Sequence, residues 1–124
     1  MGKTKDTRRL ADNQAMAVCN SIRSSSRKLN LVAQTIRGLS AEKAVAELSF
    51  SKKRIAKVAL EVLKSAIANA ENNHKLNIDK LVVAEAYTGN GIVMKRMHAS
   101  GRGRGARVLK PFSKLTIVVA ERGE

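Results

Sequence analysis

The stretch VMKRMHASGRGRGARVLK, residues 93–110, decides what kind of fold this chain has. It contains six lysines and arginines and three alternating glycines, and residues 88–114 contain no acidic residue. The stretch has no helix signal, while apolar chain with the period of a strand lies on both sides of it. The simplest interpretation is one long antiparallel hairpin with its tip near residues 100–105.

Alternating apolar residues predict the strands of a small sheet. Before the hairpin, Leu81, Val83 and Tyr87 alternate with Val82, Ala84 and Ala86, and after it Leu115, Ile117 and Val119 recur at every second position. A third, short strand is expected over residues 14–23, where Met16, Val18 and Ile22 fall on one side of a period-2 pattern.

Three helices are expected between the first strand and the hairpin. Serines at 24–26 cap the first helix and Gly38 ends it, Ser40 caps the second, and Ser51 opens the longest, which runs to about Asn73. The wide apolar arc of this last helix places it at the centre, packed on the sheet and on the other helices.

These elements predict one α+β domain over residues 14–124. Three helices pack on a small antiparallel sheet, and one long extended β-hairpin, residues 88–114, reaches beyond the body. Residues 1–13 are polar and basic and lack periodicity, so we expect a disordered basic N-terminal arm.

The charge balance points to a polyanionic partner. Twenty-four lysines and arginines against ten acidic residues give a net charge of +14. Such a surplus favours nucleic acid as partner and an anionic membrane second. The start of the chain has no apolar stretch for a signal peptide, no apolar run approaches transmembrane length, and one cysteine cannot form an internal disulfide. A soluble intracellular protein is therefore expected.

Enzyme chemistry finds little support in the sequence. The two histidines, His74 and His98, are far apart, and no metal-ligand spacing or phosphate-binding glycine pattern is present. Cys19 on a strand is read as a small core residue and not a nucleophile. We expect no catalytic residue, no metal, no cofactor and no small-molecule substrate.

The sequence favours nucleic-acid recognition by charge and shape. Three aromatic residues are too few for a base-stacking platform. Arginines bind phosphates bidentately and stack on splayed bases, and glycines permit close backbone approach. This combination fits an irregular, folded RNA, although the composition also leaves DNA open. A mobile solvated loop is the plain alternative for residues 93–110, but the apolar residues within it argue for insertion into a partner.

A second group of cations lies in the helical part of the chain. Arg23, Arg27, Lys28 and Arg37 surround the first expected helix, and Lys52, Lys53 and Arg54 open the third. They are candidate RNA-binding residues of the body. The small-residue run SAIANAENN, residues 65–73, is read as tight helix packing in preference to RNA contact.

Five segments in order resemble the bacterial large-subunit ribosomal protein L-twenty-two family. They are SSRKLNLVAQTIRG (25–38), SAIANAENN (65–73), MKR (94–96), GRGRGARVLKP (101–111) and KLTIVV (114–119). The resemblance covers about residues 24–120. The chain departs from many members at Ala99, Ser100 and Gly101, where they carry Pro-Arg-Ala.

The resemblance implies a structural protein of the cytoplasmic large ribosomal subunit that binds ribosomal RNA, supports subunit assembly and lines the polypeptide exit tunnel with its hairpin. Its implied partners are large-subunit ribosomal RNA, neighbouring ribosomal proteins and, at the hairpin tip, the nascent polypeptide. Changes near MKR alter macrolide sensitivity in such proteins. The implied RNA-binding and tunnel residues are Met94, Lys95, Arg96, His98, Arg102, Gly103, Arg104, Arg107 and Lys110.

Two other classes remain as alternatives. An architectural DNA-binding protein would use the basic ribbon in a minor groove, with an apolar or proline wedge at its tip in place of glycines. A membrane-surface protein would need an exposed amphipathic basic helix, and the longest helix has too narrow a polar stripe for one.

Overall fold

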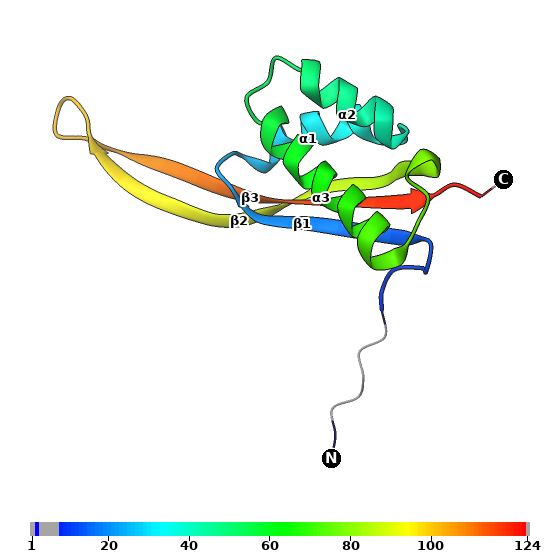
Figure 1. The fold of residues 1–124 in the computed structure, drawn as a ribbon. Helices are drawn as coiled ribbons and strands as arrows, with labels where there is room; N and C mark the ends of the chain where they lie inside the picture. Colours follow the sequence, from blue (N-terminus) through cyan, green and yellow to red (C-terminus); the bar gives the residue numbers. More distant parts are fainter. Residues whose placement is uncertain (1, 3–7, 124) are drawn as a thin grey trace.

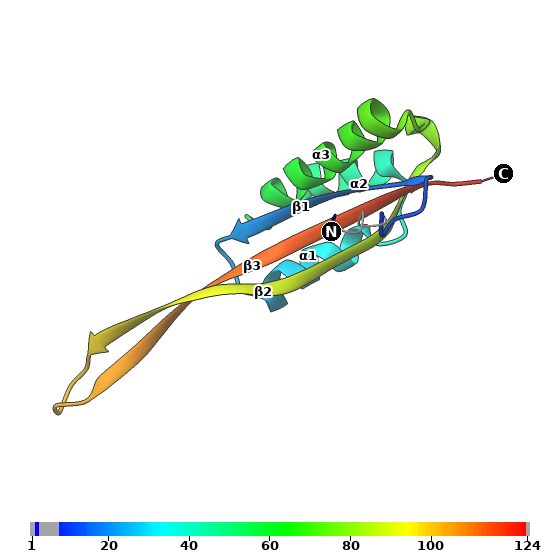
Figure 2. The same ribbon diagram turned by 90° about the horizontal axis from the view of Figure 1, so that it is seen from below.

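The computed structural model describes residue 2 and residues 8–123, and it confirms the α+β fold (Figure 1). Its elements are β1 (Gln14–Ile22), α1 (Ser26–Ile36), α2 (Ala41–Phe50), α3 (Ala56–His74), the short 3-10 helix η1 (Ile78–Lys80), β2 (Leu81–Ala99) and β3 (Gly105–Glu121). The three longer helices cover one face of a three-stranded antiparallel sheet, and β2 and β3 extend far beyond it (Figures 1 and 2).

β3 is the central strand of the sheet. The strand order is β1-β3-β2, so Ile117 pairs with Ala17 on one side and with Ala86 on the other. Leu115, Ile117 and Val119 are buried, and so are Thr116 and Val118 on the alternate positions. On the helix-free face the side chains of β1 and β2 flank those of β3 from both sides, as Met16 flanks Val118 and Tyr87 flanks Thr116, which explains this continuous burial.

The first two helices begin where their capping serines predict, and the first ends where Gly38 predicts. The Ser25 hydroxyl accepts a hydrogen bond from the Lys28 amide, and the Ser40 hydroxyl accepts one from the Lys43 amide. Gly38 follows α1 with a φ of +78°, a left-handed conformation that glycine adopts without a Cβ clash. Local capping interactions therefore set the start of α1 and of α2, and Gly38 sets the end of α1.

The predicted start of the third helix is wrong. Ser51 is the extended residue that ends α2, and α3 begins five residues later at Ala56. The Ser51 hydroxyl accepts a hydrogen bond from the Lys53 amide, a local turn that competes with helix formation. Lys52, Lys53 and Arg54 consequently lie in the loop between α2 and α3 and do not open a helix.

α3 lies close to the sheet because its contact face is made of small residues. Ala56, Ala59, Ala66 and Ala70 are fully buried, and α3 packs on β1, β3 and α2. The Asn69 amide also donates to the Met16 carbonyl at 3.0 Å. The central position of this helix is confirmed. Within residues 65–73 only Ala66 and Ala70 are buried, so the preference for packing over RNA contact stays a prediction for the exposed residues of this run.

Irregular pairing in the two outer strands changes which residues face the helices. β1 carries an extra residue between Cys19 and Ile22, and β2 carries extra residues between Val83 and Glu85 and between Asn90 and Val93. Each extra residue is a β-bulge, which reverses the alternation of side chains along its strand. Grouping Tyr87 with Leu81 and Val83 was therefore wrong. Ala86 is buried, while Tyr87, Met16 and Val18 lie exposed on the helix-free face.

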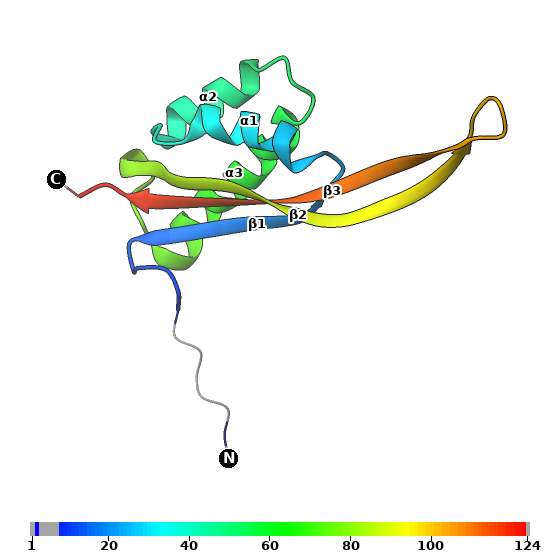
Figure 3. The same cartoon turned by 180° about the vertical axis from the view of Figure 1, so that it is seen from behind.

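The hairpin becomes a two-stranded ribbon where β1 ends. The last pair of β1 with β3 is Ile22 with Ser113, whereas β2 and β3 stay paired out to Ala99 and Gly105 (Figure 3). Residues 100–104 close the tip, with the Ser100 amide donating to the Arg104 carbonyl at 2.8 Å. Arg102 and Gly103 both have positive φ, as in the mirror-image turns that join twisted strands.

The predicted N-terminal arm lies partly outside the described residues, which omit 1 and 3–7. Its described part turns back onto the body, where the Glu121 amide donates to the Asn13 carbonyl at 2.9 Å. The Arg8 guanidinium lies 3.3 Å from His74 Nε2 at the end of α3. Disorder of this arm stays a prediction.

Candidate nucleic-acid interface

The free part of the hairpin combines charge and apolar surface at every step of its ladder. Four successive cross-strand pairs each join one cation to one apolar residue. They are Met94 with Lys110, Lys95 with Leu109, Arg96 with Val108, and Met97 with Arg107. Directly opposed side chains share a face of the ribbon, and successive pairs alternate between its faces. Both faces therefore carry cations and apolar groups together.

The protein covers neither face of this ribbon. All eight of these side chains are exposed, Met97 to 75%. An antiparallel sheet with one solvated face keeps apolar residues off that face. A ribbon with the same mixture on both sides is suited to a partner that surrounds it and offers both negative charge and flat apolar groups. Phosphates and nucleobases together meet that description.

The tip presents its arginines directly to the outside. Arg102, Gly103 and Arg104 are exposed in the closing turn. His98 is exposed on β2 shortly before that turn. The nine predicted hairpin residues thus lie along one continuous projection. The structure brings all of them to the surface.

Most of the predicted body cations lie at the end of the body from which the hairpin leaves. Arg23 donates to the Pro111 carbonyl at 2.9 Å, and the Arg54 guanidinium donates to the Arg23 carbonyl at 3.4 Å. Arg27 and Lys28 stand in the first turn of α1, which contacts the hairpin root through a hydrogen bond from Ser26 to Asn90. Lys52 and Lys53 adjoin Arg54 in the loop. The basic surface of the hairpin therefore continues onto the body.

Arg37 is exposed, but its guanidinium group makes two side-chain hydrogen bonds to the body. Its Nε donates to the Ala86 carbonyl and its Nη2 donates to Asn30 Oδ1, both at 2.7 Å. The bond to Ala86 ties the end of α1 to β2, and the bond to Asn30 holds the guanidinium against α1. The structure thus gives this residue a positioning contact that its sequence context did not indicate.

Two aromatic residues lie at the same end of the molecule, which the sequence did not indicate. Phe50 is 88% exposed at the end of α2, directly before the basic loop. Phe112 lies half-buried at the hairpin root, with the Arg23 guanidinium 5.6 Å from its ring centroid. A lone aromatic outside any periodic pattern carries no signal in one sequence, so only the fold shows that both residues lie toward the hairpin.

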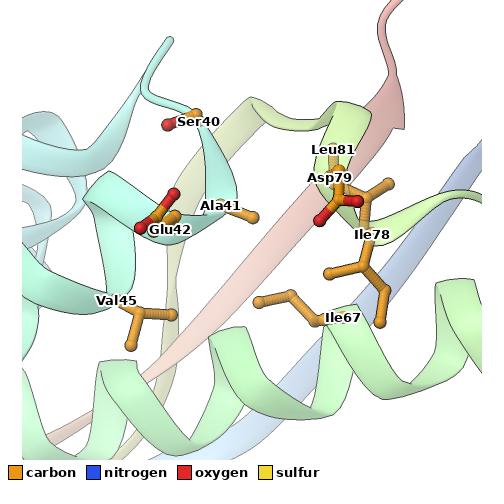
Figure 4. A pocket seen from close by; sticks show the side chains of 8 residues that line it. All are labelled: Ser40, Ala41, Glu42, Val45, Ile67, Ile78, Asp79 and Leu81. Carbon is orange, nitrogen blue, oxygen red and sulfur yellow. The ribbon is translucent and has the colours of Figure 1, made fainter.

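The end of the body opposite the hairpin carries a cavity lined by two carboxylates. This cavity of about 460 Å³ lies between α2, α3 and η1. Figure 4 shows Glu42 on one side of it, Asp79 and Ile78 on the other, and Ile67 of α3 below. Across residue 2 and residues 8–123, no group of three or more histidine, cysteine or acidic side chains is placed to hold a metal ion. Within those residues no helix is long and apolar enough to cross a bilayer.

An α+β body with a long, uncovered basic ribbon defines a class of structural nucleic-acid-binding proteins. The sequence model of the family described as Ribosomal protein L22p/L17e matches residues 17–120. The chain belongs to this family, which is structural and not enzymatic.

Curated relatives match over nearly their whole length. "Large ribosomal subunit protein uL22" of Rhizobium etli is 63% identical, covering 98% of this chain and 94% of the relative. The protein of the same name from Rhodospirillum rubrum is 59% identical, covering 100% and 98%. That from Erythrobacter litoralis is 62% identical, covering 98% and 97%.

Proposed function

We propose that this chain is a structural protein of the large ribosomal subunit in the cytoplasm. It binds ribosomal RNA, contacts neighbouring ribosomal proteins, supports subunit assembly and lines the polypeptide exit tunnel with its hairpin. The observation that carries the proposal is the ribbon of four cation–apolar pairs with both faces uncovered. Relatives named as large-subunit proteins support it over the full chain.

The mechanism is neutralisation of phosphates combined with a fit of shape. Seven lysines and arginines lie between residues 86 and 120, and an irregular RNA fold has closely spaced phosphates that repel one another. A cationic ribbon inserted among them lowers that repulsion and releases condensed counterions. The cations at the root of the hairpin, Arg23, Arg27 and Lys28, extend the contact to the body. The same insertion brings the tip residues 102–104 to the tunnel wall, where they contact the nascent chain.

Salt dependence of RNA binding tests this mechanism. The seven hairpin cations alone predict that log affinity for protein-free large-subunit ribosomal RNA falls against log salt with a slope of about −5 to −6. The cations at the root of the hairpin should make the slope of the full chain steeper. Filter binding of the full chain between 50 and 300 mM salt, roughly the range in which such slopes are resolved, gives the value. A slope near zero would overturn phosphate neutralisation.

A second comparison separates this function from architectural DNA binding. The chain should sediment with large ribosomal subunits after a moderate salt wash and should be lost from duplex DNA in the same wash. Retention on DNA with loss from the subunits would support the minor-groove alternative.

A further inference from the structure

Two β-bulges meet across the central strand at the root of the hairpin. In β1, Asn20 and Ser21 together oppose Lys114, and in β2, Gly91 and Ile92 together oppose Phe112. β3 runs between them without interruption. Bulges re-aim side chains and raise the local twist, and they are common beside functional sites. Here they stand on both sides of one short segment of β3.

A cavity of about 420 Å³ opens at this double bulge. We call it the root pocket and define it by its lining: Asn20, Ser21, Gly91, Ile92, Met94, Phe112 and Lys114. Leu115 and Ile117 face the helices, so Phe112 and Lys114, which alternate with them, lie on the helix-free side of the sheet. Pockets that bind small organic ligands have volumes of about 300–1,000 Å³, and the root pocket falls within this range.

The lining combines a flat apolar floor with polar and cationic edges. Phe112 and Met94 are joined by Ile92, which is 76% exposed and so presents most of its side chain for contact. The Arg23 guanidinium lies 5.6 Å from the Phe112 centroid, and Lys114 stands exposed at the rim. Asn20 and Ser21 supply amide and hydroxyl groups that donate and accept hydrogen bonds.

We propose that the root pocket binds one unstacked nucleobase of ribosomal RNA. The base packs against Phe112 and Ile92, Asn20 and Ser21 bond its polar edge, and Lys114 neutralises an adjoining phosphate. A base offers an apolar face, polar edges and a neighbouring negative charge in one unit, which matches the three kinds of lining group. This inference rests on the proposed RNA binding and adds a specific base contact to it.

Charge decides against the other occupants of such a pocket. A second copy of this chain would bring another +14 to a basic surface, and residues 88–114 offer no acidic group to pair with it. An apolar peptide side chain would fill the floor but leave Lys114 and Arg23 without an anion. A nucleotide supplies an apolar face for the floor of the pocket and a phosphate for its cationic edge.

Variants at Phe112 test the proposal with the full chain. Affinity for protein-free large-subunit ribosomal RNA is measured across a salt series for Phe112→Tyr, Phe112→Leu and Phe112→Ala. We expect Phe112→Tyr to bind within about twofold of the unaltered chain, and Phe112→Ala to bind about tenfold more weakly, or ~1.4 kcal/mol. Phe112→Leu should also weaken binding, because it keeps apolar bulk but loses the aromatic face. The slope against salt should not change, since no cation is removed.

A matched pair of isoleucine variants guards against loss of folding. Ile92→Ser alters an exposed floor residue of the root pocket, and Ile78→Ser alters an exposed isoleucine beside Asp79 at the end of the body opposite the hairpin. We expect about threefold weaker binding for Ile92→Ser and no change for Ile78→Ser. Equal affinity of the two variants would overturn the base contact.

Chemical probing identifies the base itself, with dimethyl sulfate for adenine and cytosine and a carbodiimide for uracil and guanine. At least one base should be protected by the unaltered chain and exposed again with Phe112→Ala, while hydroxyl-radical protection of the backbone stays the same. Wild-type affinity of Phe112→Ala and Phe112→Leu, or protection independent of Phe112, would overturn the root pocket while leaving RNA binding intact. Failure of the unaltered chain to bind with a salt-dependent slope would instead overturn the proposed function.

Discussion

At the scale of the residue, the hairpin root depends on one glycine in close contact with backbone. A Cβ built on Gly91 would lie 3.0 Å from the Phe112 carbonyl oxygen, closer than real Cβ contacts usually are. The obstacle is main chain, so it cannot move aside as the end of a flexible side chain would. Gly91 is therefore required by the close approach of β2 to β3 within the bulge.

We predict that Gly91→Ala lowers stability by about 1 kcal/mol, because the two strands must separate to admit the methyl group. The melting temperature should fall by about 3–5 °C in a domain of this size. Gly89→Ala is the matched control, since a Cβ there meets nothing within 4 Å. Equal melting temperatures for the two variants, measured by circular dichroism, would show that the strands yield without cost.

Arg37 should act through stability, because its guanidinium donates two hydrogen bonds within the body. Its removal leaves the Ala86 carbonyl and Asn30 without their donors, and so Arg37→Ala should cost about 1–2 kcal/mol of unfolding free energy in urea. Lys28→Ala, which removes an exposed side chain from the same helix, should change it little. If both variants unfold at the same urea concentration, the two hydrogen bonds contribute nothing net.

At the scale of the element, the sequence predicted β3 better than its neighbours. β3 keeps an unbroken alternation, so Leu115, Ile117 and Val119 could be assigned to one face from the period alone. The bulges all lie in β1 and β2, where an extra residue inverts the pattern without changing the composition. The hairpin cations were also predictable, because charge is visible in the sequence. The root pocket was not, since it exists only where two bulges align across β3.

The two faces of the ribbon should contribute equally to RNA binding. Lys95 and Arg107 occupy one face, and Arg96 and Lys110 the other. If RNA surrounds the ribbon, Lys95→Gln and Arg96→Gln should each reduce the magnitude of the salt slope by about 0.7–0.9. Lys64→Gln on α3 serves as the control and should leave the slope unaltered. A change confined to one face would mean that the ribbon lies on the RNA surface and is not inserted.

At the scale of the whole molecule, the body and the free hairpin have separate sources of stability. Among the described residues, the hydrophobic core takes nothing from the chain between Ala86 and Leu115. Core burial scales with apolar area removed from water, so the body should keep its stability when the ribbon is shortened. The ribbon has no such core, and a two-stranded hairpin alone is marginal in water. Its geometry thus depends on the partner.

A register-matched deletion separates these two parts. Removing Met94–Arg96 shortens β2, and removing their partners Val108–Lys110 as well keeps Met97 opposite Arg107. The ribbon loses three pairs, roughly 10 Å of reach. We expect a melting temperature within about 2 °C of the unaltered chain, because the core is intact. In ribosomes that carry this variant, macrolide response and crosslinks from the tip to nascent chains should change.

Charge and reach are distinguished by a full-length variant with Lys95→Gln and Arg96→Gln together. It keeps the length of the ribbon and lowers only its charge, so it should weaken RNA binding while the tip still crosslinks to nascent chains. The shortened chain should lose those crosslinks because the tip no longer reaches the tunnel wall. If the shortened chain leaves macrolide response and crosslinks unchanged, the tip does not line the exit tunnel. Unfolding of the body would show instead that ribbon and core are one cooperative unit.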